Sequence, residues 1–204
     1  AAMDEARDWP DGPWARELHR DLFEHAGLSC VINRNWSGVL CGYVGVTDAH
    51  PWYGKKYSDR VPWNRETVPV TEKAGPIPLL IEAMQPANDG RCALDVLIPV
   101  HGGLTFSGPI QWPDLTMPET VWFFGFDCGH AGDVSPGLLR SHEDFERRHP
   151  QFAGYRDTDV YRTFDYVRGE VQTLAEWLAL AQQMAGVTRR VRRPPSAAAG
   201  SAPK

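Results

Sequence analysis

Residues 160–184 carry the pattern that most limits the fold of this chain. Their apolar side chains recur alternately four and three positions apart, at Val160, Phe164, Val167, Val171, Leu174, Leu178 and Ala181. This spacing places them on one face of an α-helix, and such a face has to be buried. The helix can pack on a β-sheet, or it can pair with a second copy of the chain, since the same spacing suits a coiled coil.

The other predicted elements are shorter. Apolar residues at helical spacing before Gly27 predict an amphipathic helix over residues 13–26. Apolar or β-branched runs between turn residues predict strands over 29–33, 39–46, 92–100 and 121–126. Between them we expect a long surface loop over 47–76, one or two helical turns over 77–84, and a loop or edge strand over 106–118. The predicted class is α+β: a mainly antiparallel sheet of four or five strands, covered by a long C-terminal and a shorter N-terminal helix.

The length of 204 residues fits a single domain, which we place over residues 1–186. Residues 187–204 are basic and then rich in Pro, Ala and Ser, so we expect a disordered tail. The net charge of −5 argues against nucleic acid as a partner and favours a small-molecule or protein ligand. No apolar run is long enough to cross a membrane, and residues 1–14 lack an apolar signal segment. We therefore expect a cytoplasmic protein, either a monomer or a homodimer, that does not bind membranes.

Two glycine-flanked polar segments follow predicted strands. One strand ends at His101, before Gly102, Gly103 and Thr105, and the other leads into a segment with four polar or reactive side chains, Asp127, Cys128, His130 and Asp133. Glycines allow sharp turns and leave neighbouring side chains accessible, which is common in functional sites. If the two strand ends lie at the same end of the sheet, these side chains form one site.

Three interpretations of this site stay open. His101, Asp127, His130 and Asp133 can bind a divalent metal, with zinc or manganese as the candidates. Without a metal, Cys128 or Cys41 can be a nucleophile with His101 or His130 as its base, and Asp127 orienting the imidazole. In the third interpretation the residues are structural, with Asp127 capping the turn that follows it. The four cysteines, Cys30, Cys41, Cys92 and Cys128, form no CxxC pair and are expected to be reduced and mostly buried.

The segment 48–57 is a candidate for substrate binding, because aromatic rings beside lysines can stack on a ligand and meet its negative charge. The residues assigned to substrate binding are His50, Trp52, Tyr53 and Lys55, together with Thr105. The same segment can also be a loop that its aromatic side chains hold in place.

The segments CGYVGV (41–46), HPWYGK (50–55), HGGLTF (101–106), FGFDCGHAGD (124–133) and DYVRGEVQTLAEWL (165–178) together resemble a family of small bacteriophage and actinobacterial proteins. The resemblance covers about residues 28–182. It implies a virus-associated or prophage context, and it assigns no activity and no catalytic residues. In a phage-encoded protein, the cytoplasm would be that of the host cell.

The leading hypothesis is a small, virus-associated hydrolytic enzyme with catalytic residues among His101, Asp127, Cys128 and His130. The alternative is a non-catalytic phage accessory protein that binds a small molecule or a host protein through Trp52, Tyr53, Tyr57 and Trp63. A third hypothesis is an assembly role, with the apolar face of the 160–184 helix as the interface.

Overall fold

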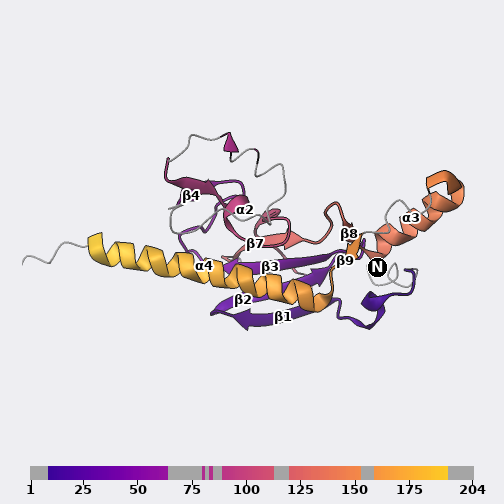
Figure 1. Cartoon of the computed structure of the whole chain (residues 1–204). Helices are drawn as coiled ribbons and strands as arrows, with labels where there is room; N and C mark the ends of the chain where they lie inside the picture. Colours follow the sequence, from indigo (N-terminus) through magenta and orange to yellow (C-terminus); the bar gives the residue numbers. More distant parts are fainter. Residues whose placement is uncertain are drawn as a thin grey trace, which may run out of the picture.

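A computed structural model of the chain describes residues 9–63, 80, 83–84, 89–112, 120–152 and 159–192. Its centre is a five-stranded antiparallel sheet in the order β1-β2-β3-β7-β6, and the long helix α4 crosses this sheet (Figure 1). The strands and the helix are β1 (Arg20–His25), β2 (Leu28–Arg34), β3 (Leu40–Val46), β6 (Phe106–Gly108), β7 (Trp122–Asp127) and α4 (Phe164–Arg192). The predicted α+β class, with its sheet and its covering C-terminal helix, is confirmed.

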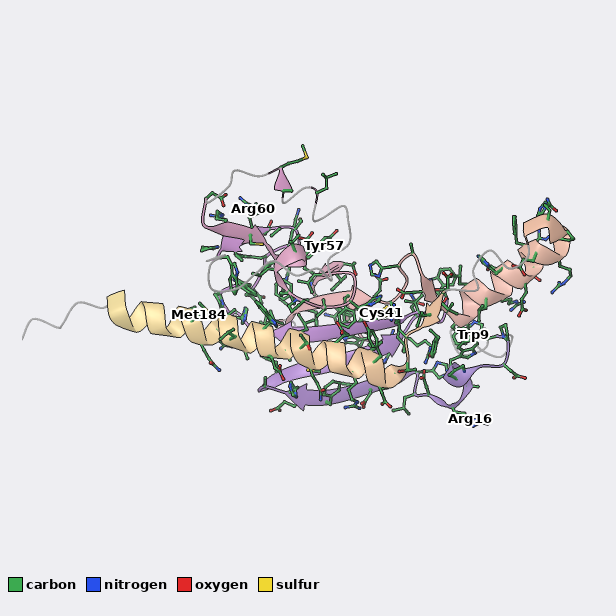
Figure 2. The ribbon with its side chains drawn as sticks, viewed as in Figure 1. Trp9, Arg16, Cys41, Tyr57, Arg60 and Met184 are labelled. Carbon is green, nitrogen blue, oxygen red and sulfur yellow. The ribbon has the colours of Figure 1, made fainter. Side chains whose placement is uncertain are left out.

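Helix α4 buries its apolar face on the sheet. Val167, Val171, Leu174 and Leu178 are fully buried, and side chains fill the space between the helix and the strands (Figure 2). The sheet is therefore one partner of the apolar face. The predicted start of the helix was too early, because residues 160–161 form a short strand and α4 begins at Phe164. At its other end α4 continues to Arg192, into the segment predicted to be a disordered tail, and residues 193–204 lie outside the described residues.

The predicted N-terminal helix over 13–26 is wrong. Residues Pro13–Arg16 form a single 3₁₀ turn, η2, and the chain then enters β1, which pairs along its whole length with β2. Ala26 and Gly27 both have positive φ, at 52° and 76°, as a two-residue hairpin turn requires. Leu18 and Leu22 from the apparent helical stripe are largely exposed. In residues 20–25, backbone hydrogen bonding to β2 therefore decides the structure, and the helical spacing of the apolar residues does not.

The predicted strand over 92–100 is also largely wrong. Strand β5 (Arg91–Ala93) pairs with β4 (Arg60–Pro62) in a separate ribbon, and the chain then forms the helical turn α2 (Leu94–Leu97). Residues Leu94 and Val96 to Ile98 are completely buried, and Asp95 between them is buried too. A short run that is buried on all sides does not distinguish a strand from a helix. Most of the predicted 77–84 turns lie outside the described residues.

Strands β2, β3 and β7 confirm three of the four predicted strands, and β7 lies inside the sheet, between β3 and β6. The predicted loop or edge over 106–118 contains the edge strand β6; residues 113–119 lie outside the described part. The predicted loop over 47–76 contains β4, and its residues 64–76 lie outside the described part of the chain.

A parallel pair of two-residue strands, β8 (Asp133–Val134) and β9 (Val160–Tyr161), lies at one end of the sheet. Between them in sequence come α3 (Pro136–Arg148), which projects from this end (Figure 1), and the 3₁₀ turn η3 (Pro150–Phe152). Among the described helices, none is long and apolar enough to cross a membrane. The β8–β9 pair brings the loop after β7 next to the start of α4, which is where the candidate site forms.

The packing of α4 on β3 predicts the effect of adding a methyl group at Gly42. A Cβ atom there would lie 2.4 Å from Cγ2 of Val171 and 2.7 Å from the Phe126 ring, which is too close for either. Gly42→Ala should lower the free energy of unfolding by about 1–3 kcal/mol, as measured by urea denaturation. Gly169→Ala is the matched control on the helix, because its Cβ would meet nothing within 4 Å, and it should raise stability by about 0.5–1 kcal/mol. If Gly42→Ala left the free energy of unfolding unchanged, this close packing of α4 on β3 would be contradicted.

Candidate functional site

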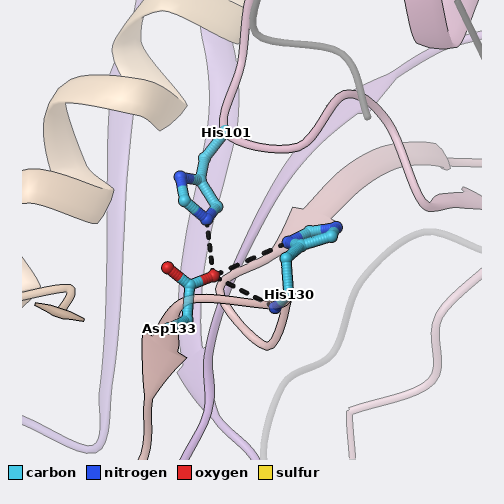
Figure 3. A group of neighbouring side chains, drawn as sticks. All are labelled: His101, His130 and Asp133. Carbon is cyan, nitrogen blue, oxygen red and sulfur yellow. Dashed lines mark hydrogen bonds and ion pairs between the residues drawn. The ribbon is translucent and has the colours of Figure 1, made fainter. Parts of the chain in front are cut away.

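Three side chains, His101, His130 and Asp133, meet beyond the end of β7 (Figure 3). Nε2 of His101 lies 2.7 Å from Oδ2 of Asp133, and Nδ1 of His130 lies 3.8 Å from the same oxygen. The two imidazole rings meet edge to face, with their centroids 5.4 Å apart. The structure thus brings together three of the four residues predicted as metal ligands.

His101 reaches the group by a route that differs from the predicted one. It follows the buried segment after α2 and precedes a turn in which Gly102 and Gly103 have positive φ. The turn feeds β6, and because β6 is antiparallel to β7, the beginning of β6 lies beside the end of β7. Two polar segments from different parts of the chain therefore meet at one end of the sheet, although the expected strand over 92–100 does not form.

Gly102 makes room for His130. A Cβ atom at Gly102 would lie 2.3 Å from Cε1 of the His130 ring, and the φ of +67° at this position favours glycine independently. Asp127 shapes the other side of the loop, since Oδ1 accepts a hydrogen bond from the backbone N–H of Gly129 and Oδ2 accepts one from the Thr105 hydroxyl. Asp127 therefore caps the turn that follows it, and it lies 4.0 Å from Nδ1 of His130.

Asp133 is the most buried member of the group, with 2% of its side chain exposed. Its Oδ1 accepts a hydrogen bond from Nε of Arg162 at 2.8 Å, and its Oδ2 accepts one from the backbone N–H of His130 at 3.0 Å, besides its contact with His101. Burial alone would raise the pKa of this carboxyl group. The hydrogen bonds from Arg162 and His101 outweigh burial and hold the pKa below its ordinary value, so Asp133 is a carboxylate at neutral pH.

His130 has an unsatisfied ring nitrogen. Its Nδ1 atom is buried and has no hydrogen-bond partner within the described parts of the chain, although the carboxylates of Asp133 and Asp127 lie at 3.8 and 4.0 Å. A buried polar atom without a partner is uncommon in folded proteins. The ligand atoms that His101, His130 and Asp133 offer all lie within 4.8 Å of one another, so this group could hold a metal ion.

Two further residues contact the group, and the sequence analysis did not identify either. The Tyr166 hydroxyl lies 3.0 Å from Nδ1 of His101, and Arg162, which binds Asp133, stacks its guanidinium over the Tyr166 ring. Burial, with Glu170 nearby, raises the pKa of Tyr166, so its phenol stays protonated at neutral pH. Polar residues four positions apart at the start of a predicted helix were the available signal for this pair.

The residues predicted for substrate binding in 48–57 lie elsewhere. His50 is buried, with Nε2 placed 2.9 Å from the carbonyl oxygen of Leu178, whereas His101 contacts Tyr166. Tyr166 and Leu178 are twelve residues apart on α4, which corresponds to about 18 Å along the helix axis.

The rest of this segment is held in place by its own contacts. Trp52 is buried and donates its backbone N–H to Nδ1 of His50, and the carbonyl oxygen of Lys55 accepts a hydrogen bond from Trp122. Tyr53 is partly exposed and lies against Trp122. Thr105 differs from these residues because it hydrogen-bonds Asp127 at the edge of the site. The segment 48–57 is therefore a loop pinned to α4 and β7.

All four cysteines are free and buried, as predicted. Burial, assisted by the Asp133 carboxylate, raises the pKa of the Cys128 thiol far above its ordinary value. Burial and the nearby Asp127 raise the pKa of Cys41 to about 11. Since the thiolate is the nucleophile, neither environment favours the predicted thiol mechanism at neutral pH.

A cleft of about 640 Å³ lies beside the group and shares Asp133 with it. Its walls come from the turn between β2 and β3, from the loop after β7, and from the first turns of α3. The lining residues are Trp9, Trp36, Ser37, Val39, Cys128, Gly129, Asp133, Ser135, Gly137, Leu138, Arg140 and Ser141. A volume of this size accommodates a small organic ligand.

The lowered pKa of Asp133 predicts how stability depends on pH. Because the folded-state pKa lies below the unfolded value, the Asp133 contacts stabilise the fold fully above the ordinary carboxyl pKa of about 4. This contribution is lost as the pH falls through the folded-state pKa. At pH 7, Asp133→Asn should therefore lower the free energy of unfolding by about 3 kcal/mol, since it leaves Arg162 without its buried counter-charge. The difference between wild type and variant should shrink below pH 4 in urea titrations; a difference independent of pH would contradict the charged state assigned to Asp133.

The buried thiols predict a second result. In the native protein at pH 8, none of the four cysteines should react rapidly with the thiol reagent DTNB, because all are buried and Cys30 and Cys41 have pKa values raised to about 11. All four should react after denaturation in guanidinium chloride. Rapid native labelling of Cys128, located by mass spectrometry, would restore the thiol mechanism.

Comparison with protein-family models, with curated proteins and with solved structures found no match to this chain. The function is therefore inferred from the geometry and chemistry of the site.

Proposed function

We propose that this protein is a small metal-dependent hydrolase whose centre is formed by His101, His130 and Asp133. The observation that carries the proposal is the buried Nδ1 atom of His130, which lacks a hydrogen-bond partner among the described residues and lies 3.8 Å from Oδ2 of Asp133. A cation between these atoms would satisfy both of them. Two imidazoles and one carboxylate form a ligand set that leaves a position open for water or substrate.

The distances support this assignment with small adjustments. Protein ligands lie about 2.0–2.2 Å from zinc, so tetrahedral ligand atoms lie about 3.4 Å from one another. The contact between Asp133 and His130 is 3.8 Å and that between Asp133 and His101 is 2.7 Å, so one would shorten and the other lengthen by less than 1 Å. The third pair of ligand atoms, one from each imidazole, lies within 4.8 Å.

The neighbouring residues suit roles around such a centre. Arg162 binds Oδ1 of Asp133 and leaves Oδ2 directed toward the two histidines. Tyr166 contacts Nδ1 of His101, so its hydroxyl oxygen can accept a hydrogen bond from Nδ1–H when Nε2 acts as a ligand. Outer contacts of this kind orient metal-binding histidines and select their tautomer.

Zinc is the favoured ion, with manganese second, because imidazole nitrogens dominate the ligand set and suit zinc better. Such an ion polarises a substrate oxygen or lowers the pKa of a water molecule, which supports hydrolysis of esters, amides or phosphoesters. Four free thiols agree with a cytoplasmic setting, where thiols are kept reduced. The phage-related context implied by the sequence resemblance stays a prediction.

The same contacts support a metal-free alternative. The Asp133 carboxylate lies 2.7 Å from Nε2 of His101 and can orient this imidazole, which then serves as an acid–base group. Tyr166 then occupies Nδ1, the other nitrogen of the ring. In this alternative the hydrolase uses the Asp133–His101 pair alone, and His130 serves to shape the loop.

Metal content separates the two mechanisms. Purified, untagged wild-type protein, loaded with zinc and desalted, should retain one zinc per chain by elemental analysis and should hydrolyse at least one member of a panel of p-nitrophenyl esters and phosphates. His101→Ala and His130→Ala should each weaken zinc binding at least 100-fold and abolish the hydrolysis, because each removes one of three ligands.

His149→Ala is the matched control, since His149 is exposed at the C-terminal end of α3, which projects away from the sheet (Figure 1). It should retain both zinc and activity. Asp127→Asn should also retain zinc, because both Asp127 oxygens are engaged with Thr105 and Gly129. Hydrolysis without bound metal would support the Asp133–His101 mechanism. If the folded protein bound no metal and hydrolysed none of the substrates, the proposed function would be rejected.

A further inference from the structure

We propose that this protein forms a symmetric homodimer in which β1 pairs with β1 of a second copy, antiparallel and centred on Leu22, so that the two sheets become one. This inference goes beyond the proposed hydrolase and does not depend on it. The apolar face of α4, the interface predicted from sequence for an assembly role, is buried on the sheet and does not provide this contact.

The outer edge of β1 carries backbone groups that face away from the sheet. β1 is an outermost strand, whose neighbour in the sheet is β2 (Figure 1). The two-residue turn after His25 makes His25 and Leu28 a hydrogen-bonded pair, and pairs along an antiparallel ladder alternate between bonded and non-bonded. The N–H and C=O groups of Leu22 and Glu24 therefore point away from β2. No described residue supplies a partner for them.

The two edges of the sheet differ in how open they are. Proteins protect exposed edges by keeping the strand short, by a bulge or by proline. β1 has none of these features, because its six residues, RDLFEH, contain no proline and pair with β2 in a continuous register. The opposite edge, β6, has three residues and is followed directly by Pro109. Of the two edges, β1 is thus the one that suits a partner strand.

The side chains of β1 leave room for another strand beside it. Leu22 is 43% exposed although it is a large apolar residue, and an adjacent strand would cover part of it. Asp21 and Phe23 point to the other face, where both contact Arg168 of α4. A strand added at the edge would therefore bury Leu22 without displacing these contacts.

A second copy of β1 fits this edge because the strand is complementary to itself. When Leu22 lies opposite Leu22 of the partner subunit, the outward backbone groups of the two strands meet, and the pairing extends along the whole of β1. Centring the pair on Glu24 would place two carboxylates directly opposite each other, which is unfavourable. It would also leave the beginning of β1 beyond the partner strand.

The charges near the axis agree with this register. Asp21 would lie opposite Phe23 of the partner subunit, and in each chain the Phe23 ring lies under the guanidinium of Arg168. Asp21 and Arg168 already form an ion pair within the chain. Since each pair is neutral, two of them can lie side by side across the axis without repulsion.

Sedimentation velocity of the full chain tests the inference. A six-residue edge buries less than the roughly 1,600 Å² of a standard interface, so a dissociation constant of about 1 µM or weaker is expected. Between about 10 µM and about 0.5 mM, the sedimentation coefficient should rise with concentration toward that of a dimer. Leu22→Lys should weaken the dimer by roughly tenfold or more, because it places two ammonium groups opposite each other. A monomer at every concentration would overturn the inference.

Glu24→Pro tests the backbone contact separately. The N–H of Glu24 points away from β2, so proline removes a hydrogen bond to the partner strand and none within the chain, a position where edge strands tolerate proline. The dimer should weaken by roughly tenfold or more, while the melting temperature at low concentration stays close to that of wild type. Glu24→Gln is the matched control, because it keeps the N–H and should dimerise like wild type.

A cysteine at the axis tests the register and does not require Glu24→Pro to fold. All four native cysteines are buried. Leu22→Cys, oxidised with glutathione disulfide, should form an intermolecular disulfide, because facing residues of a bonded antiparallel pair lie about 5.5 Å apart. Ser29→Cys is the matched control, exposed on β2 and one strand farther from the axis, and should not cross-link. Equal cross-linking of both variants, or a dimer that neither Leu22→Lys nor Glu24→Pro weakens, would overturn the inference.

Discussion

The buried carboxylate of Asp133 is the interaction on which the organisation of this end of the molecule depends. A carboxylate removed from water is unfavourable unless hydrogen bonds and opposite charge compensate for its lost hydration. Here the compensation comes from three places in the chain: His101 before β6, the backbone of His130 after β7, and Arg162 before α4. The buried carboxylate is stable only when all three donors are in place. Asp133 therefore connects three segments that the sheet alone does not hold together.

A second carboxylate holds the start of α4 from the other side. Glu17 accepts hydrogen bonds from Arg34, from the Tyr161 hydroxyl and from the backbone N–H of Phe164. Arg34 is completely buried, so this pair too is held inside the protein. Residues 161–164 are thereby fixed between two anchored carboxylates, and Arg162 and Tyr166 reach the site from a rigid helix start. The N-terminal segment, which a sequence pattern misrepresents as a helix, is what supplies this anchor.

Elements with a strong local sequence signal are the ones that were predicted correctly. The apolar stripe on α4 and the strands β2 and β3 were predicted because a long helical period and apolar runs bounded by turn residues are local patterns. Residues 13–26 were misassigned because a weak helical period concealed a strand that pairs with β2 through the turn at Ala26 and Gly27. Residues 92–100 were misassigned because only their first residues pair, with the distant strand β4, and the chain then forms the buried helical turn α2. The grouping of His101 with His130 and Asp133 was anticipated from glycine-flanked polar segments, yet the geometry that achieves it is the antiparallel β6–β7 pairing.

What the sequence could not distinguish was which polar residues face one another. Asp127 and Asp133 look equivalent in a glycine-rich segment, but the Asp127 oxygens cap a turn, while Asp133 lies inside and receives charged donors. Cys128 sits between two predicted site residues, yet burial makes its thiol a poor nucleophile. The loop after β7 thus buries Cys128 and Asp133 and leaves Asp127 and His130 partly exposed. Of its side chains, the imidazole of His130 combines partial exposure with an unsatisfied nitrogen, and this combination makes the loop a candidate for chemistry as well as for structure.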